Sequence, residues 1–207
     1  MSRVLGKIHY WLFNKIQWFE GLEEEIADIS KEKGIITEQW QLELYNKYGE
    51  PTPKIPLEEI IDTDNIHGWL QERIHSAEGR QAEYITKILK EEPKNIEFLM
   101  DIYKKQGLKA GALEVVDNAI AIYKELNNYI LEGMPCDRVI ELIENSEEIV
   151  SWRIVEDLHG HFYDSIGGDV NNFHNLRKMW IKSFVEGTNS GYTYMTTENG
   201  DHVIERV

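Results

Sequence analysis

Four long stretches of the chain carry apolar residues at the spacing of an α-helix. Apolar side chains that recur three and four positions apart form one face of a helix, and that face packs against other helices. Glycine or proline separates each stretch from the next, and both residues interrupt helices. The pattern therefore predicts an all-α fold, an up-down bundle of four long helices. The four stretches cover about residues 3–33, 67–90, 108–131 and 136–165.

Shorter elements complete the predicted bundle. Thr37 is a suitable N-cap for a short helix, and Gly107 is expected to end another. Three prolines between residues 49 and 56 exclude a helix there and predict a stiff link between packed units. The short helices and one helical turn are expected at about residues 37–48, 57–61, 95–106 and 169–186.

The last residues of the chain have a different character. Two runs rich in Tyr, Thr, Val and Ile flank the dipeptide Asn199-Gly200. Asn-Gly between β-prone runs is a strong signal for a β-hairpin, because both residues accept the positive φ angles of the tight turn. We therefore predict a helical bundle domain at residues 1–187 and a β-hairpin appendage at residues 188–207.

Charge and cysteine content exclude several classes of function. A formal net charge of −15 opposes binding to nucleic acid, because phosphate backbones are negative as well. The single cysteine, Cys136, allows neither an intrachain disulfide nor a zinc site built on several thiolates. We expect no signal peptide, because polar residues interrupt the apolar residues of the first segment, and no apolar run is long enough to span a bilayer. We expect a cytoplasmic protein that binds neither nucleic acid nor membrane.

Side chains that could bind protons or metals gather at the end of the fourth stretch. This stretch is apolar on more than one side, which is typical of a helix in the core. Imidazole and carboxylate groups at the end of a core helix are the best candidates for chemistry in this chain. The ionisable residues there are Glu156, Asp157, His159, His161 and Asp164.

Two Glu-x-x-His motifs lie on the second and fourth predicted long helices. They are Glu72-Arg-Ile-His75 and Glu156-Asp-Leu-His159, and residues three apart on a helix can reach one metal ion. In this respect the chain resembles the ferritin-like di-metal carboxylate bundles. The resemblance implies a metal centre between four helices, with one further carboxylate from each of the other two. The candidates for these are Glu20 or Glu23 on the first helix and Glu114 or Asp117 on the third.

The apolar stripe of the second helix favours a different pair. His75 and Glu78 fall on the side expected to face inward, Glu72 falls on a polar side, and His67 lies on a neighbouring edge. A mononuclear site with His159 or His161 is the alternative. The count of histidines is similar to that of the DinB-like metal bundles, which carry one histidine on the second helix and two on the fourth.

The first functional hypothesis is thus a helical bundle that binds one or two divalent transition metal ions, with Fe, Mn, Zn and Ni as candidates. Any activity would be metal-assisted, either redox or hydrolytic. The predicted metal ligands are His67, His75, Glu78, Glu156, His159 and His161.

The second functional hypothesis is a non-catalytic interaction or self-assembly module. The first helix is rich in aromatic residues on several sides, more than one bundle face requires. Its exposed part would then mediate association into a homo-oligomer. The aromatic residues are Tyr10, Trp11, Phe13, Trp18 and Phe19.

Overall fold

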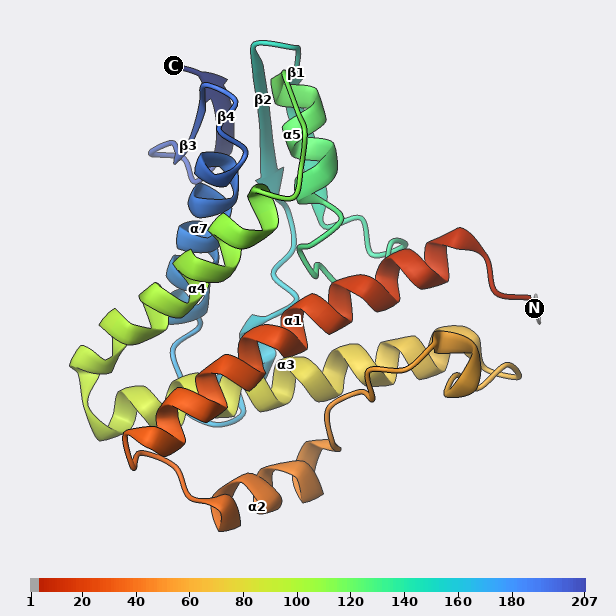
Figure 1. Cartoon of the computed structure of the whole chain (residues 1–207), viewed down its shortest axis with the longest axis vertical. Helices are drawn as coiled ribbons and strands as arrows, with labels where there is room; N and C mark the ends of the chain where they lie inside the picture. Colours follow the sequence, from red (N-terminus) through yellow and green to blue (C-terminus); the bar gives the residue numbers. More distant parts are fainter. Residues whose placement is uncertain (1–3) are drawn as a thin grey trace.

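A computed structural model of the chain describes residues 4–207, which form a mostly helical fold with a small antiparallel sheet toward the C-terminus (Figure 1). The helices are α1 (Lys7–Glu32), α2 (Glu38–Tyr48), α3 (Ile66–Glu91), α4 (Ile96–Gly111), α5 (Ala119–Leu126), α6 (Gly160–Asp164) and α7 (Val170–Gly187), with 3₁₀ turns η1 (Leu57–Glu59) and η2 (Pro93–Asn95). The strands are β1 (Ile140–Asn145), β2 (Ile149–Ile154), β3 (Tyr192–Thr196) and β4 (His202–Arg206).

Helices α1 and α3 confirm two of the predicted long helices. Each is 26 residues long, and they lie side by side (Figure 1). Their apolar stripes face each other, with Ile16 and Ile26 of α1 and Leu70 and Ile85 of α3 fully buried. Helix α2 begins after Thr37, whose side chain accepts a hydrogen bond from the Trp40 amide as predicted.

The predicted third long helix is wrong in its middle. Helix α4 ends at Gly111, and the chain turns before the shorter α5 begins. Leu113 and Val115, in the connection between them, are exposed. Their side chains therefore do not belong to a buried helical face. Apolar spacing alone predicted a continuous helix through residues that form a turn and a connection.

The predicted fourth long helix is also wrong, so the four-helix arrangement is not found. Residues 140–154 form the hairpin of β1 and β2, and only the short α6 follows it. In β2, Val150 and Trp152 point to the covered face of the sheet, and residues on that face alternate along the strand. A short run of apolar, β-branched residues fits a strand as well as a helix, and periodicity cannot separate the two.

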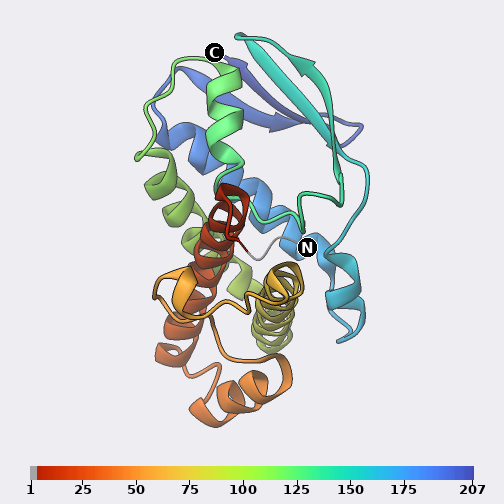
Figure 2. The same cartoon turned by 90° about the vertical axis from the view of Figure 1, so that its right-hand side faces the viewer.

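The C-terminal β-hairpin is confirmed, and it belongs to a larger sheet. The strand order is β1-β2-β4-β3, and all neighbours are antiparallel. Figure 2 shows both hairpins in one sheet at the end of the molecule that carries the C-terminus. Because β4 pairs with β2, backbone hydrogen bonds cross the predicted domain boundary at residue 187. The division into two domains stays a prediction.

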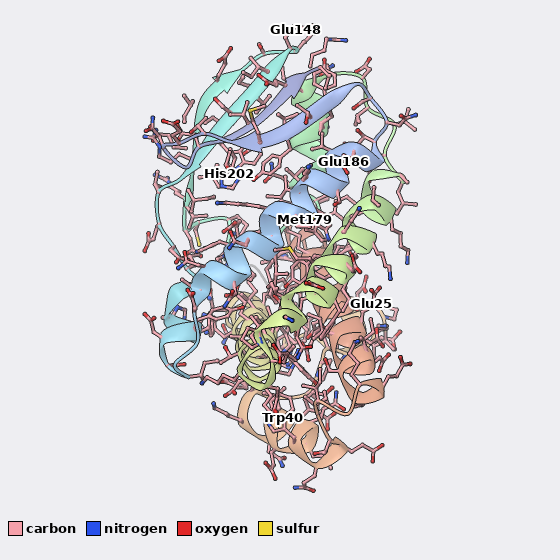
Figure 3. All side chains as sticks on the ribbon, turned by 90° about the vertical axis from the view of Figure 1, so that its left-hand side faces the viewer. Glu25, Trp40, Glu148, Met179, Glu186 and His202 are labelled. Atoms are coloured by element: carbon pink, nitrogen blue, oxygen red, sulfur yellow. The ribbon has the colours of Figure 1, made fainter. Side chains whose placement is uncertain are left out.

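Aromatic side chains fill the space between the sheet and the helices. Trp152 of β2 stacks on His202 of β4, with ring centroids 5.1 Å apart, and Tyr123 of α5 also packs against Trp152, with ring centroids 4.9 Å apart. The Tyr194 hydroxyl lies 2.7 Å from His202 Nδ1. Figure 3 shows His202 on the side of the sheet that faces α7. Burial lowers the pKa of His202 to about 4, so its ring is neutral and packs as an aromatic group.

Helices α4 and α7 pack with their backbones in close contact, and glycine makes this possible. A Cβ atom on Gly111 would lie 2.0 Å from the Phe184 carbonyl oxygen, and one on Gly107 would lie 2.4 Å from that of Trp180. The prediction that Gly107 ends a helix is therefore wrong. It lies inside α4 because the neighbouring backbone of α7 leaves no room for a side chain.

Replacing Gly111 with alanine should destabilise the fold despite the better helix propensity of alanine. The propensity gain is about 1 kcal/mol, whereas forcing extra atoms into a packed contact costs about 1–3 kcal/mol. Because the clash is with backbone, we expect the higher cost and a net loss of about 2 kcal/mol in urea unfolding. Gly21→Ala in α1 is the matched control: its Cβ would meet only the Gln106 side chain, at 3.4 Å. Equal stability of the two variants would contradict this packing.

Candidate functional site

Four ionisable side chains meet in the interior, and we call them the interior ionic cluster: Glu78, Glu132, His159 and Arg177. Glu78 lies in the middle of α3, Glu132 in the connection between α5 and β1, His159 directly before α6, and Arg177 on α7. His159 is 4% exposed and Glu78 is 5% exposed. Residues from four distant parts of the sequence thus build one buried polar site.

The imidazole of His159 lies between two carboxylates. Its Nδ1 is 3.1 Å from Glu78 and its Nε2 is 3.2 Å from Glu132. Arg177 Nη1 lies 2.7 Å from Glu132 and 2.7 Å from His159 Nε2, and its other amino group donates to the Leu131 carbonyl oxygen. A charged imidazolium donates to both carboxylates. A neutral ring that keeps its proton on Nδ1 instead accepts from Arg177 at Nε2.

The surrounding charges decide between these two states of His159. Burial disfavours the charged ring, but the negative charge of Glu78 and the hydrogen bonds to Glu132 and Glu78 outweigh it and raise the pKa of His159 to about 9. Burial likewise opposes the charge of Glu132, yet Arg177 and His159 lower the pKa of this carboxyl to about 2. At neutral pH the cluster therefore contains a protonated His159 and the guanidinium of Arg177, which pair with the carboxylates of Glu78 and Glu132.

The backbone around His159 is held by Asp157. The Asp157 carboxylate accepts hydrogen bonds from the backbone amides of His159, at 2.8 Å, and Gly160, at 3.3 Å. These two bonds fix the turn that leads from Asp157 into α6 and carries His159. Phe173 of α7 packs against the imidazole, with ring centroids 4.5 Å apart.

A cavity of about 40 Å³ lies next to the cluster, between α1, α4, α7 and residues 129–131. We call it the aromatic cavity. Gln106 ties its walls together, because its amide donates to the Trp18 carbonyl and accepts from the Trp180 indole N–H. Arg177 is the charged residue on its wall, so cavity and cluster are in contact. The lining residues are Trp18, Phe19, Leu22, Tyr103, Gln106, Tyr129, Ile130, Leu131, Phe173, Arg177 and Trp180.

A second, narrower space also borders the cluster. It is lined by Glu78 and His159 together with Gln81 and Tyr163, and it is too tight for a water molecule. The Gln81 amide nitrogen and the Tyr163 hydroxyl are buried and have no hydrogen-bond partner among residues 4–207. Buried polar atoms are normally paired, so this side of the cluster carries unused donors.

The structure brings two of the predicted metal ligands together, Glu78 and His159. The others lie elsewhere. His75 is exposed on α3, bonds to Gln71 and lies near His161, with ring centroids 6.5 Å apart.

Two further predicted ligands, Glu156 and His67, lie apart from the pair of Glu78 and His159 and from the pair of His75 and His161. Glu156 is exposed in the connection after β2. His67 pairs with His9 at the start of α1, with their Nε2 atoms 3.3 Å apart.

The interior ionic cluster does not fit a metal ion well. Both ring nitrogens of His159 face carboxylates, and the guanidinium of Arg177 already holds the position where a cation would bind. Within residues 4–207, no group of three or more His, Cys, Asp or Glu side chains is arranged to hold a metal. Metal binding, and the identity of any metal, stay predictions.

The sequence pattern contained a signal for one missed residue. Arg177 follows Phe173 by four positions and precedes Ile181 by four, so it falls on the apolar stripe of its helix. A charge on a buried face needs a partner. Glu132 shows no such signal, because it lies in an irregular connection whose path cannot be read from spacing.

The aromatic residues of α1 contact the same chain. Phe13 and Phe19 are buried, Trp11 donates to Asn128, and Trp18 packs edge-on against Tyr129 with ring centroids 4.8 Å apart. Their number is thus largely explained without a partner. Self-association through α1 stays a prediction.

Comparison of the chain with protein families, curated proteins and solved structures finds no match. Among the described helices, none combines the length and the apolar character needed to cross a membrane. Function therefore has to be inferred from the geometry of the interior ionic cluster and the aromatic cavity.

Proposed function

We propose that this protein binds a small molecule in the aromatic cavity, with the polar group of the ligand against the interior ionic cluster. The observation that carries the proposal is the shared wall: Arg177 lines the cavity and at the same time pairs with Glu132 and His159. An apolar pocket with a few convergent polar groups of shifted pKa is the usual form of a ligand site.

The volume of the cavity limits the ligand. A buried water needs roughly 10–15 Å³ of cavity volume, so about 40 Å³ admits a group of only a few heavy atoms. Trp18 and Tyr129 on its wall are partly exposed, which leaves room for a ligand to extend toward solvent.

The chemistry of the walls selects the kind of ligand. Arg177 can only donate hydrogen bonds, and Gln106 is already used by the two tryptophans. The polar group of the ligand should therefore be an acceptor, such as a carboxylate or a carbonyl oxygen. Aromatic walls favour an apolar body beside it. A short-chain carboxylic acid or carbonyl compound meets both requirements.

Binding can be tested with a set of small acids and their amides. Ligand-observed NMR with acetate, propionate, butyrate and benzoate should detect an acid that binds more tightly than its amide. Leu22→Phe adds atoms to the cavity wall and should weaken this binding at least tenfold. Leu42→Phe, at a position that is 56% exposed, is the matched control and should leave binding unchanged.

Thermal unfolding of both phenylalanine variants would show that each is folded. Failure of all four acids to bind would contradict the proposal. Unchanged binding to folded Leu22→Phe protein would contradict it equally, since the ligand would then lie elsewhere.

A further inference from the structure

An open groove of about 550 Å³ runs along the exposed side of α1 and is distinct from the interior ionic cluster. One stripe of the helix, which includes Asn14, Gln17 and Trp18, forms one wall, and the connections that follow α4 and α5 form the other. A second groove of about 570 Å³ adjoins it along α1, because the same three residues line it too. We call the two together the α1 groove. It reaches Glu25, which is labelled in Figure 3.

Aromatic rings and amide groups make up most of the wall in the part of the groove near Tyr129. Trp18 and Tyr129 are two of its four aromatic residues, and Asn14, Gln17 and Asn128 supply three primary amides. An amide both donates and accepts hydrogen bonds, as a hydroxyl group does, and an aromatic ring offers an apolar face for C–H groups. The wall therefore matches a ligand that combines hydroxyl groups with an apolar face.

The charges on this wall do not favour an ionic ligand. They belong to Lys7 and Glu114, one of each sign, so they largely cancel, whereas the whole chain has a formal net charge of −15. A neutral ligand is therefore expected. A pyranose sugar is neutral, carries hydroxyl groups around its edge and presents C–H groups on the face of its ring, so it meets each of these requirements.

The wall is held in place before a ligand arrives, and one amide on it is open. The Trp11 indole N–H donates to Asn128 at 2.8 Å, and the Tyr129 hydroxyl donates to Glu114. Asn14 is exposed, and its amide has no hydrogen-bond partner within residues 4–207. Side chains that are already ordered lose little freedom on binding, which favours affinity. The amide of Asn14 is thus free to bond to a hydroxyl group.

We propose that the α1 groove binds a neutral oligosaccharide, with one sugar ring packed on Trp18 and its hydroxyl groups bonded to Asn14 and Gln17. Trp18 lines both parts of the groove, so further rings can continue along the helix on either side. The volume of one part alone, about 550 Å³, lies in the usual range of ligand sites, roughly 300–1,000 Å³. The inference goes beyond the proposed function. Trp18 and Tyr129 line both sites, but a sugar in the groove needs no ligand in the aromatic cavity.

Saturation-transfer NMR on the full-length protein tests the proposal with three probes: cellotriose, maltotriose and triacetylchitotriose. At least one of them should receive magnetisation from the protein, mostly at the C–H protons of one ring. Asn14→Ala removes one hydrogen-bonding group and should weaken this binding about fivefold. Trp18→Leu removes the aromatic surface and should weaken it about tenfold. Asn46→Ala, at an exposed position on α2, is the matched control for Asn14→Ala and should leave binding unchanged.

Thermal unfolding identifies the variants that are folded, and Asn14→Ala decides the question if Trp18→Leu is not. Saturation transfer to none of the three sugars would overturn the proposal. Equal binding by Asn14→Ala and Asn46→Ala protein would overturn it as well, because the sugar would then lie elsewhere. Leu22→Phe should leave sugar binding unchanged, and a loss as large as that in Trp18→Leu would place the sugar in the aromatic cavity instead.

Light scattering separates a sugar from a second copy of the chain as the occupant of the groove. Wild type is expected to be a monomer at the concentration of the NMR experiment. A dimer that Trp18→Leu dissociates would assign the groove to a second copy and reject the sugar. Failure of the four small acids to bind, in a protein that does bind a sugar, would overturn the proposed function of the aromatic cavity alone.

Discussion

Replacing Arg80 with methionine is expected to lower the free energy of unfolding by about 3–5 kcal/mol. Arg80 of α3 is fully buried, and its guanidinium lies 2.7 Å from Glu20 and 2.7 Å from Glu23, both on α1. It also donates to the Gly49 carbonyl oxygen and the Ser76 hydroxyl. Its removal would leave two carboxylates in the interior without a cation, which is the reason for the large loss.

Arg80 also holds the proline-containing link against the two long helices. The carboxylate of Glu20 accepts from the backbone amide and the hydroxyl of Thr52, so one network joins α1, α3 and the segment at residues 49–56. The segment with the three prolines therefore packs against the buried ion pair of Arg80 and Glu20. Loss of Arg80 should therefore loosen this link as well as the contact between the helices.

Urea unfolding of Arg80→Met beside wild type measures the effect. Arg153→Met is the control, because Arg153 pairs with Asp201 at the surface and its loss should leave the midpoint close to that of wild type. Adding Glu20→Gln and Glu23→Gln to Arg80→Met should recover part of the stability, since the excess charge is removed. A loss below about 1 kcal/mol for Arg80→Met would show that water reaches the carboxylates of Glu20 and Glu23. The ion pairs of Arg80 would then contribute little to the stability of the fold.

Long helices and tight turns could be predicted from the sequence because their signals are local. Twenty-six residues of regular apolar spacing in α1 and α3 leave little alternative to a helix. The turn at Asn199-Gly200 joins β3 and β4 because Gly200, with φ 84°, takes up the conformation that the turn needs.

The hairpin of β1 and β2 could not be predicted, because its stability comes from distant residues. Val150 pairs with Ile204 of β4, more than fifty positions along the chain. Nothing in residues 140–154 alone distinguishes this strand from a buried helix. The same limit applies to Gly107, whose role depends on the approach of α7 and not on its own neighbours.

The candidate site was predicted in part for the same reason. Glu78 and His159 were predicted because ionisable groups on apolar segments are unusual, and they do meet. Their chemistry depends on Glu132 and Arg177, which reach the same point from a connection and from α7. With these two present, the cluster is a set of ion pairs beside a cavity, which differs from the metal centre that the spacing of Glu and His suggested.

The stability that His159 contributes should decrease as the pH rises from 6.5 to about 9. In the unfolded chain the imidazole loses its proton near pH 6.5, whereas in the folded chain the carboxylates of Glu78 and Glu132 keep it until about pH 9. Below pH 6.5 both states are protonated and the full contribution is present. Between the two values the folded protein binds the extra proton, so stability falls as the pH rises, and above about pH 9 the contribution is lost.

The difference in unfolding free energy between wild type and His159→Gln isolates this effect. The interval from 6.5 to about 9 corresponds to about 3 kcal/mol, so the difference should shrink by about that amount between pH 6 and pH 9.5. Taking the difference between the two proteins removes the pH dependence that other groups contribute. Lys15 is one such group: because its pKa is lowered to about 7 in the folded protein, the stability of both proteins rises with pH above 7. His75→Gln makes the same replacement at an exposed position and is the matched control. A difference for His159→Gln that stays constant over this range would mean that the buried ring is neutral and accepts from Arg177.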